Sequence, residues 1–379
     1  MKLNAYQFKP DQGWSTPLDA ALDSPSTLIV VFGPPDEGTC LQALEALISS
    51  FPNSLIVGCS SAGEIYGEGV FDDTLSVSVT QFERSKLKLA YASVSTPEES
   101  LFAGRDIAER LNEPDLKMVF ALSDGLAVNG SKLTDGFNML FSDDIFVTGG
   151  LAGDGSRFEK TWVLMDGRPT SGIISAVGLY GTSLSVSHGS KGGWDTLESE
   201  LTVTHSIGNV LYELDDQIAL DVYKHYMGKD AEGLPASGLL YPLALKNDEE
   251  ADGYTVRTIL AVDEKAGSIT FAGDIPDDTR VQLMRADFGH LIDGAAQASS
   301  SATSLLETNR PVLSIAISCV GRRLVLGERT KEELEATYSF FPEGSHQIGF
   351  YSYGEISPLA SGHCDLHNQT MTLTLIGEE

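Results

Sequence analysis

The sequence predicts an α/β fold in which a βαββ unit is repeated, giving mixed sheets with helices packed against them and two domains in all. Two segments far apart in the chain support this. Residues 55–69 and 347–362 are both apolar runs that end on Gly-Glu-Ile, at 63–65 and at 354–356. Strands and helices are expected in the same order around both turns. A chain of 379 residues is also long enough to bury two ordinary cores.

The first copy of the unit is expected as strand, helix, strand and strand. Its first strand is a continuous β-branched run, and its last strand alternates apolar and polar residues. The helix has Leu41, Leu44 and Leu47 on one face and stops at a Phe-Pro pair, where proline prevents continuation. The four segments are "TLIVVFG" (27–33), "TCLQALEALISSFP" (39–52), "SLIVGCS" (54–60) and "TLSVSVTQF" (74–82).

Two further copies follow the same order. The one nearest the C-terminus has a second helix that ends at Phe-Pro, and the middle one has a glycine-rich turn after its second strand. The middle copy is "LKMVFALSDG" (116–125), "SKLTDGFNMLF" (131–141), "DIFVTGGLAGDG" (144–155) and "KTWVLM" (160–165). The last copy is "PVLSIAISCVG" (311–321), "TKEELEATYSFFP" (330–342), "QIGFYSYGEI" (347–356) and "QTMTLTLI" (369–376).

The region between the middle and last copies gives the best domain boundary. Apolar residues at 207, 210, 211 and 214 predict a short helix, and a second helix is expected from Gln217 to Met227, closed by Gly228. The predicted domains are 25–215 and 216–379. The longest helix is expected further on, with its apolar stripe formed by Met284, Phe288, Leu291, Ile292 and Ala295.

Composition excludes several classes of partner. The formal net charge is −29, from 54 acidic and 25 basic residues, and such a surface repels nucleic acid and anionic membranes alike. No basic segment followed by an apolar core opens the chain, which argues against secretion. The four cysteines form no CxxC pair and are expected as thiols in a reducing compartment. The predicted location is therefore the cytoplasm.

An ordered set of motifs resembles the FIST proteins, sensory modules built from an N-terminal and a C-terminal FIST domain. No single motif is as specific as a zinc-finger spacing, but together they follow the family's order over nearly the whole chain. The motifs are "GCSSAGEI" (58–65), "VTGGLAGDG" (147–155), "GIISAVGLYG" (172–181), "VTHSIGNVLYELDDQIALDVYKHYMG" (203–228), "GFYSYGEISP" (349–358) and "HNQTMTLTLI" (367–376).

The resemblance implies a non-enzymatic sensor of bacterial signal transduction. Members of the family are regarded as small-ligand input domains, and amino acids and related metabolites have been proposed as their ligands. Some stand-alone members bind haem, respond to nitric oxide and act on a histidine kinase or a cyclic-di-GMP enzyme. The function implied here is binding of an amino-acid-like metabolite, with the signal passed to such a partner protein. A haem-binding nitric oxide sensor of the same fold is the alternative.

The glycine-rich strand ends are the predicted ligand site. Glycines let the backbone approach a ligand closely, and two acidic groups suit an amino or guanidino group. The alternative reading of Glu64 and Glu355 is that each caps backbone N–H groups in its own turn. The predicted ligand-binding residues are Cys59, Ser60, Ser61, Gly63, Glu64, Gly150, Gly153, Asp154, Tyr353, Gly354, Glu355, His367 and Asn368.

Three other chemistries are weaker readings of the same residues. An enzyme would use Cys59 as nucleophile or Glu64 and Glu355 as an acid–base pair, but 58–62 lacks the G-x-S-x-G elbow and Cys59 reads as a small buried hydrophobe. The glycines of 149–155 are followed by a strand, whereas a dinucleotide fingerprint opens a helix. No metal site is expected, and His225, beside an apolar helix face, is a weak candidate for a haem ligand.

Overall fold

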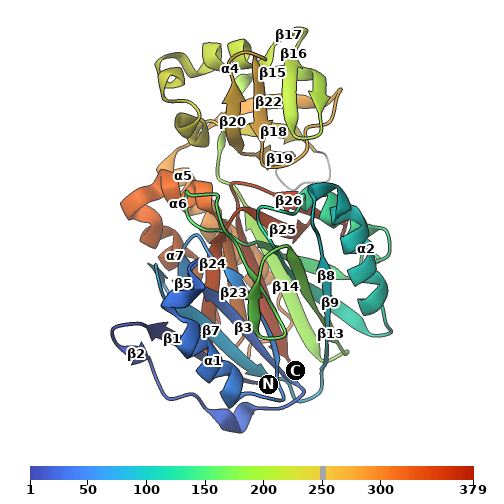
Figure 1. The fold of residues 1–379 in the computed structure, drawn as a ribbon, viewed down its shortest axis with the longest axis vertical. Helices are drawn as coiled ribbons and strands as arrows, with labels where there is room; N and C mark the ends of the chain where they lie inside the picture. The colour runs from blue at the N-terminus through green and yellow to red at the C-terminus, as the bar shows by residue number, and fades with distance from the viewer. Residues whose placement is uncertain (248–252) are drawn as a thin grey trace.

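The computed structural model describes residues 1–247 and 253–379 of the chain. Its described strands form four sheets, three in a large body and one in a smaller module at one end (Figure 1). The two chain termini lie close together at the opposite end, where the Met1 amino group is 3.4 Å from a carboxylate oxygen of Glu378. The predicted α/β class with mixed sheets is confirmed.

The large body is built from three copies of one unit, as the sequence predicts, but the unit is longer than βαββ. Each copy gains an extra strand at its start and a short hairpin before its last strand. The strand expected at 160–165 is not the last strand of the middle copy, because it belongs to a hairpin that pairs with the first copy, and the last strand is at 173–180. The first copy comprises β1 (Lys2–Lys9), β3 (Thr27–Gly33), α1 (Leu41–Ser50), β4 (Leu55–Ser60), β5 (Glu64–Tyr66), β6 (Gly69–Phe71) and β7 (Leu75–Gln81), with β2 (Gly13–Trp14) beside β1.

The second and third copies repeat this order with additional helices. The second comprises β8 (Lys86–Ser93), α2 (Ser100–Leu111), β9 (Leu116–Ser123), α3 (Gly130–Asn138), β10 (Phe146–Leu151), β11 (Val163–Met165), β12 (Arg168–Thr170) and β13 (Ile173–Tyr180). The third comprises β14 (Leu184–Lys191), α5 (Phe288–Ser304), β23 (Leu313–Cys319), α6 (Val320–Leu326), α7 (Thr330–Tyr338), β24 (His346–Ser352), β25 (Gly354–Pro358), β26 (Cys364–His367) and β27 (Met371–Glu378).

The three copies exchange their hairpins in a closed cycle. The β5–β6 hairpin of the first copy joins β24 of the third, the β25–β26 hairpin of the third joins β10 of the second, and the β11–β12 hairpin of the second joins β4 of the first. Within each sheet the helix-linked pair is parallel, for example β3 with β4, and its other neighbours are antiparallel. Each sheet is thus completed by residues from another copy.

The core lies between the inner faces of the three sheets. Alternate residues of β3 face opposite sides, so Leu28, Val30 and Phe32 enter this common core while Ile29 and Val31 pack toward α1. Phe32 stacks on Phe350 of β24, with ring centroids 4.6 Å apart. Each such fully buried side chain stabilises the fold by about 1.5–3 kcal/mol.

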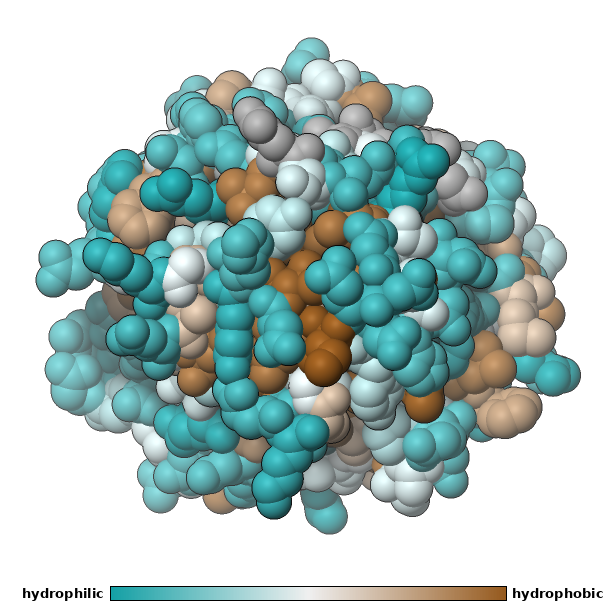
Figure 2. All heavy atoms as spheres, turned by 90° about the horizontal axis from the view of Figure 1, so that it is seen from above, coloured by the Kyte–Doolittle hydropathy of each residue, from teal (hydrophilic) through white to brown (hydrophobic). Residues whose placement is uncertain are grey.

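A separate module is inserted in the third copy between β14 and α5 (Figure 1). Its strands form an eight-stranded sheet of its own, covered by α4 (Ala219–Met227) and the 3₁₀ turn η5 (Ala236–Leu240). Seen from this end, the molecule is mostly hydrophilic with a small apolar area near the centre (Figure 2). The strands are β15 (Asp195–Ile207), β16 (Val210–Leu214), β17 (Gln217–Ile218), β18 (Leu243–Lys246), β19 (Tyr254–Arg257), β20 (Ile259–Asp263), β21 (Ser268–Phe271) and β22 (Arg280–Arg285).

Two predictions in this region need correction. The short helix expected at 207–214 is wrong, because these residues form the β15–β16 hairpin, with Gly208 at φ +59 in its turn. The long helix begins at Phe288 because Asp287 caps it by accepting from the N–H groups of Gly289 and His290, so Met284 belongs to β22.

Two other features of this region bear on the predicted boundaries. The helix expected at 217–227 is present as α4, but it begins at Ala219 because residues 217 and 218 pair with β16 as β17, and Gly228 closes it at φ +60. Residues 215 and 216, the predicted domain boundary, lie in the turn between β16 and β17, inside the inserted module. Among the described residues, no helix is long and apolar enough to cross a membrane.

Candidate functional site

The glycine-rich strand ends of all three copies meet, as the Gly-Glu-Ile repeat predicts. The Gly153 N–H donates to the Ser60 carbonyl at 3.1 Å, and the Tyr353 N–H donates to the Leu151 carbonyl at 3.0 Å. The Ala62 N–H donates to the Tyr351 carbonyl at 2.8 Å, which closes the cycle. Segments 58–65 and 349–356 therefore lie side by side.

Glu64 and Glu355 occupy the same place in two of these turns. The Ser61 hydroxyl donates to one oxygen of Glu64 at 2.5 Å, and Thr74 donates to the other through its N–H and hydroxyl, both at 3.1 Å. Ser352 and Thr370 serve Glu355 in the same way, with hydroxyl distances of 2.5 and 2.9 Å. Each carboxylate is a cap of its own turn.

Burial sets the protonation of both groups. Glu64 is 1 % exposed and Glu355 is 0 % exposed. Desolvation raises the pKa of Glu64 to about 7 and that of Glu355 to about 8, although the hydrogen bonds to each oppose the shift.

Asp154 is the third member of this series, in Ala-Gly-Asp where the other turns have Ala-Gly-Glu and Tyr-Gly-Glu. It accepts from the N–H groups of Phe158, Glu159 and Lys160, each at 2.8 Å, and from the Tyr353 hydroxyl. Burial alone would raise the pKa of Asp154, but these hydrogen bonds bring it below its usual value. Asp154 therefore fixes the loop that follows β10.

The other strand-end residues are packed into the protein. Cys59 is fully buried, which raises the pKa of its thiol, and the Ser60 hydroxyl accepts from the Trp162 N–H at 3.1 Å. Gly63 has φ +136, and a Cβ there would lie 2.4 Å from the Arg323 guanidinium. The remaining three glycines contact neighbouring segments closely, and an added Cβ would meet them at 2.7 to 3.1 Å: Gly150, Gly153 and Gly354.

A polar cleft of about 410 Å³ opens where the inserted module meets the third copy. His290 and Asp195 form a contact in its lining, with His290 Nδ1 2.8 Å from the carboxylate, and this hydrogen bond raises the pKa of His290. The lining combines acidic, basic and aromatic groups: Lys191, Trp194, Asp195, Tyr254, His290, Asp293, Gln297, His367 and Thr370 among them.

Two of the predicted residues lie at or behind this cleft. His367 lines it, and its Nε2 is 3.2 Å from the Ser357 carbonyl. Asn368 is fully buried next to it, donates to the His367 carbonyl at 3.0 Å, and has a side-chain oxygen with no partner among the described residues. Thr370, also in the lining, connects the cleft to Glu355.

A second, apolar cavity of about 450 Å³ lies elsewhere along the boundary between module and body. Of the predicted residues, Tyr353 lines it. Among the described lining residues, the two side chains with an atom that could ligate haem iron are Tyr353 and Cys319. Burial raises the pKa of the Cys319 thiol to about 12. The Tyr353 hydroxyl donates a hydrogen bond to Asp154. His225 is exposed on α4 and packs edge-on against Tyr226. These residues do not fit a haem site.

Comparison with known proteins decides the family. A model of the FIST N domain matches residues 27–217, and a model of the FIST C domain matches residues 219–358. The chain belongs to the FIST family. This match confirms the resemblance seen in the motifs. FIST domains are small-ligand sensory domains of signal transduction.

Other comparisons add little to the FIST assignment. A search among curated proteins found no match. Among solved structures, the FIST chain is similar to a cyanuric acid hydrolase from A. caulinodans, with 10 % sequence identity and a TM-score of 0.35 over 100 % of this chain and 99 % of that one.

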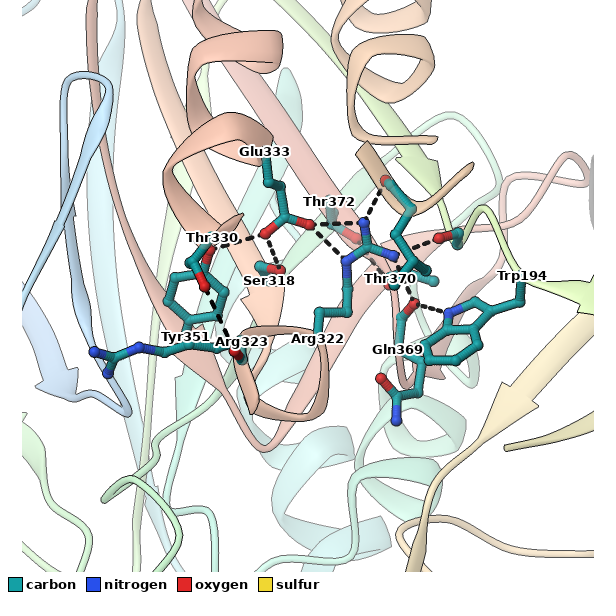
Figure 3. A network of polar contacts seen from close by, with 12 residues as sticks. Trp194, Ser318, Arg322, Arg323, Thr330, Glu333, Tyr351, Gln369, Thr370 and Thr372 are labelled. Atoms are coloured by element: carbon teal, nitrogen blue, oxygen red, sulfur yellow. Dashed lines mark hydrogen bonds and ion pairs between the residues drawn. The ribbon is translucent and has the colours of Figure 1, made fainter. Parts of the chain in front are cut away.

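A buried network connects the FIST body to the two ends of the inserted module (Figure 3). Arg322 donates to the carbonyls of Gly192 and Leu291, which lie next to β14 and at the start of α5. It also donates to the Gln369 carbonyl at 3.2 Å, an acceptor that it shares with the Trp194 indole N–H at 2.8 Å. Both connections of the module thus meet at one guanidinium.

The sequence did not single out several of these groups. Asp195 lies 95 residues before His290, with the inserted module between them, and Asp293 follows His290 on the same helix, so no local pattern joins all three. Arg322 follows a strand in "CVGRRL" and carries no motif. The sequence signal that could have indicated the polar cleft was "KGGW" at 191–194, where two glycines precede a tryptophan.

Proposed function

We propose that this FIST protein is a non-enzymatic cytoplasmic sensor that binds an amino-acid-like metabolite in the polar cleft. Ligand binding there passes a signal to a separate partner protein, a histidine kinase or a cyclic-di-GMP enzyme. The observation that supports this most is that the cleft lining carries both charges next to aromatic rings. An α-amino acid likewise carries one positive group, the ammonium, and one negative group, the carboxylate, both attached to its α-carbon.

The cleft offers a complementary group for each part of such a ligand. Asp293 and Asp195 suit an ammonium group, and Lys191 and His290 suit a carboxylate. Trp194 and Tyr254 supply flat apolar surface for a side chain. Of the predicted residues, His367 is assigned a direct contact, while Glu355 acts as a positioning residue through Thr370.

The position of the cleft suits a sensor. Its walls come from β14, α5 and the inserted module, and the Arg322 network holds both connections of that module. A ligand that prefers one placement of the module would shift the population of placements by its difference in affinity.

The strand-end groups support a role other than turnover. Cys59 is buried with a raised thiol pKa, and Glu64 and Glu355 are held in separate turns by their own Ser and Thr partners. None of these three side chains lines the described polar cleft or the apolar cavity. A nucleophile or an acid–base pair needs access to substrate.

The test is a thermal-shift screen of the full chain against the common amino acids and their amines, followed by calorimetry on each hit. A ligand at a hundred times its Kd stabilises the folded state by about 2.7 kcal/mol. Binding should weaken at least tenfold in Asp293→Asn and stay unchanged in Asp144→Asn, an exposed aspartate after α3. If no compound binds, or if Asp293→Asn binds as well as the parent protein, the polar cleft is not the sensing site.

The partner is tested after a ligand is found. Purified histidine kinases and cyclic-di-GMP enzymes from the same cell are assayed with the loaded and the empty protein. A partner whose activity changes only with the loaded protein supports the signalling step. Equal effects of loaded and empty protein on every such enzyme would contradict it.

A further inference from the structure

The apolar cavity has a wall made by two bodies. The body contributes the loop after β10 and the start of α6, including Phe158 and Leu324. The inserted module contributes η5, β20 and Ala272 after β21, including Leu239 and Leu260. The volume of about 450 Å³ is that of a small-molecule site. No described lining residue is charged, although charged residues make up 21 % of the chain.

Phe158 presents a ring to this cavity in a constrained position. Its φ is +55, a backbone conformation that bulky side chains rarely adopt, and Asp154 holds it there by accepting from its N–H. The ring stacks on Tyr353 with centroids 4.5 Å apart and an interplanar angle of 15°. Phe158 is nevertheless 46 % exposed, so stacking on Tyr353 leaves part of the ring uncovered.

One polar atom in the wall has no hydrogen-bond partner among the described residues. The Thr258 side chain is 5 % exposed, and its hydroxyl makes no hydrogen bond with any described residue. Buried hydroxyls are nearly always satisfied by protein, water or ligand. Two side chains of the wall can titrate, Cys319 and Tyr353. Burial raises the pKa of both. At neutral pH the described lining of the cavity therefore carries no charge.

We propose that this cavity is a second binding site, for an uncharged, flat ring compound with one hydrogen-bonding group. The ring lies against Phe158 and the leucines, and the hydrogen-bonding group meets the Thr258 hydroxyl. The site differs in chemistry from the polar cleft, where an amino acid is expected. Because its wall also spans the body and the inserted module, the second ligand contacts the same boundary between them.

The probe for the first test is N-phenyl-1-naphthylamine, a neutral compound in which one N–H joins a naphthalene to a phenyl ring and whose fluorescence rises in apolar surroundings. The full chain should give a saturable increase. Leu324→Glu places a charge in the wall at a leucine that is 47 % exposed and should weaken binding at least tenfold. The control is Leu305→Glu, at a 61 % exposed leucine after α5, which should bind as the parent protein does.

Two results of this test would contradict the proposed site. Failure of the parent protein to show saturation, or equal binding by Leu324→Glu, excludes the cavity as the place of binding. Should Leu324→Glu fail to fold by circular dichroism, Leu260→Glu makes the same test from the opposite wall, at a leucine that is 42 % exposed. Amino-acid binding in the polar cleft should persist in all these variants, so the two proposals fail separately.

The second test concerns the hydroxyl. Thr258→Val keeps the shape of the side chain and removes the unpartnered oxygen. It should weaken N-phenyl-1-naphthylamine about threefold to tenfold, since a hydrogen bond is lost. It should leave 1-phenylnaphthalene, which has no N–H, unchanged in competition for the same site. Equal effects on both compounds, or no effect on either, overturn the role of Thr258.

Discussion

Arg322 and Glu333 form an ion pair in which neither side chain is exposed. Nε and Nη2 of Arg322 each lie 2.7 Å from the same oxygen of Glu333. The other carboxylate oxygen accepts from the Tyr351 hydroxyl at 2.8 Å. The pair therefore links α6, α7 and β24 at the point where the connections of the inserted module converge (Figure 3).

Removing one member of this pair should be costly. Arg322→Met leaves Glu333 buried without its counter-charge and should lower the free energy of unfolding by about 3–5 kcal/mol. The double variant Arg322→Met with Glu333→Leu should be more stable than Arg322→Met alone. Urea unfolding followed by circular dichroism measures both, and Arg329→Met, whose partner Glu332 is exposed, is the control with a loss of at most about 1 kcal/mol. A small loss in Arg322→Met would mean that water reaches Glu333.

Glu64 and Glu355 should make stability fall as pH rises. Their folded-state pKa values, about 7 and about 8, exceed the 4.5 that is usual for a glutamate in water, so the native state holds protons that the unfolded chain has released. Their contribution is complete below about pH 4.5 and is lost as pH rises toward 8, at about 1 kcal/mol per pH unit for each group.

Urea titrations between pH 5 and pH 8 measure this slope. Glu355→Gln should flatten it, since the amide does not titrate, and Glu64→Gln should flatten it at slightly lower pH. Glu328→Gln, an exposed glutamate between α6 and α7, should leave the slope as it is. A parallel profile in Glu355→Gln and the parent protein would show that Glu355 is ionised throughout.

Asp154 should be the residue that orders the loop carrying Phe158. Asp154→Ala removes the acceptor of three N–H groups, and the amides of 158–160 should exchange with deuterium at least tenfold faster. Peptide-level exchange by mass spectrometry measures this, with Asp144→Ala as the control. Unchanged protection of 158–160 would show that the stacking of Phe158 on Tyr353 is enough to hold the loop.

The repeat was visible in the sequence because its long strands and helices carry strong periodicity. Leu41, Leu44 and Leu47 mark α1, and the β-branched run of 27–33 marks β3. The hairpin exchange was not visible, because β5 and β6 have three residues each and their partner β24 lies far along the chain. A strand that short has no periodicity to read, and its choice of partner is a long-range property.

The candidate site could be predicted only in part from the sequence, for a related reason. The polar residues of the Gly-Glu-Ile turns correctly located the meeting point of the three copies. The Ser61 and Ser352 hydroxyls, however, donate their hydrogen bonds to the glutamates three residues later. A local pattern does not distinguish a polar group that serves its own turn from one that faces a ligand. The cleft residues Trp194 and Asp293 come together only through the inserted module.

Gly63 should tolerate replacement poorly. Its φ is +136, a conformation that is open to glycine alone, and a Cβ would lie 2.4 Å from Nη1 of Arg323. Arg323 is held there by Asp72 at 2.7 and 2.8 Å, so it cannot move away without losing that pair. Gly63→Ala should therefore lower the free energy of unfolding by about 2–4 kcal/mol, from strain and from the lost contacts.

Gly67 provides the matched control, because it also has positive φ, at +59, yet no atom of the described residues lies within 4 Å of an added Cβ. Gly67→Ala should cost only the backbone term, about 1 kcal/mol. Urea unfolding of both variants separates strain from steric conflict. If the two variants lose the same stability, Arg323 yields to the methyl group, and the close approach at Gly63 is not what requires glycine at that strand end.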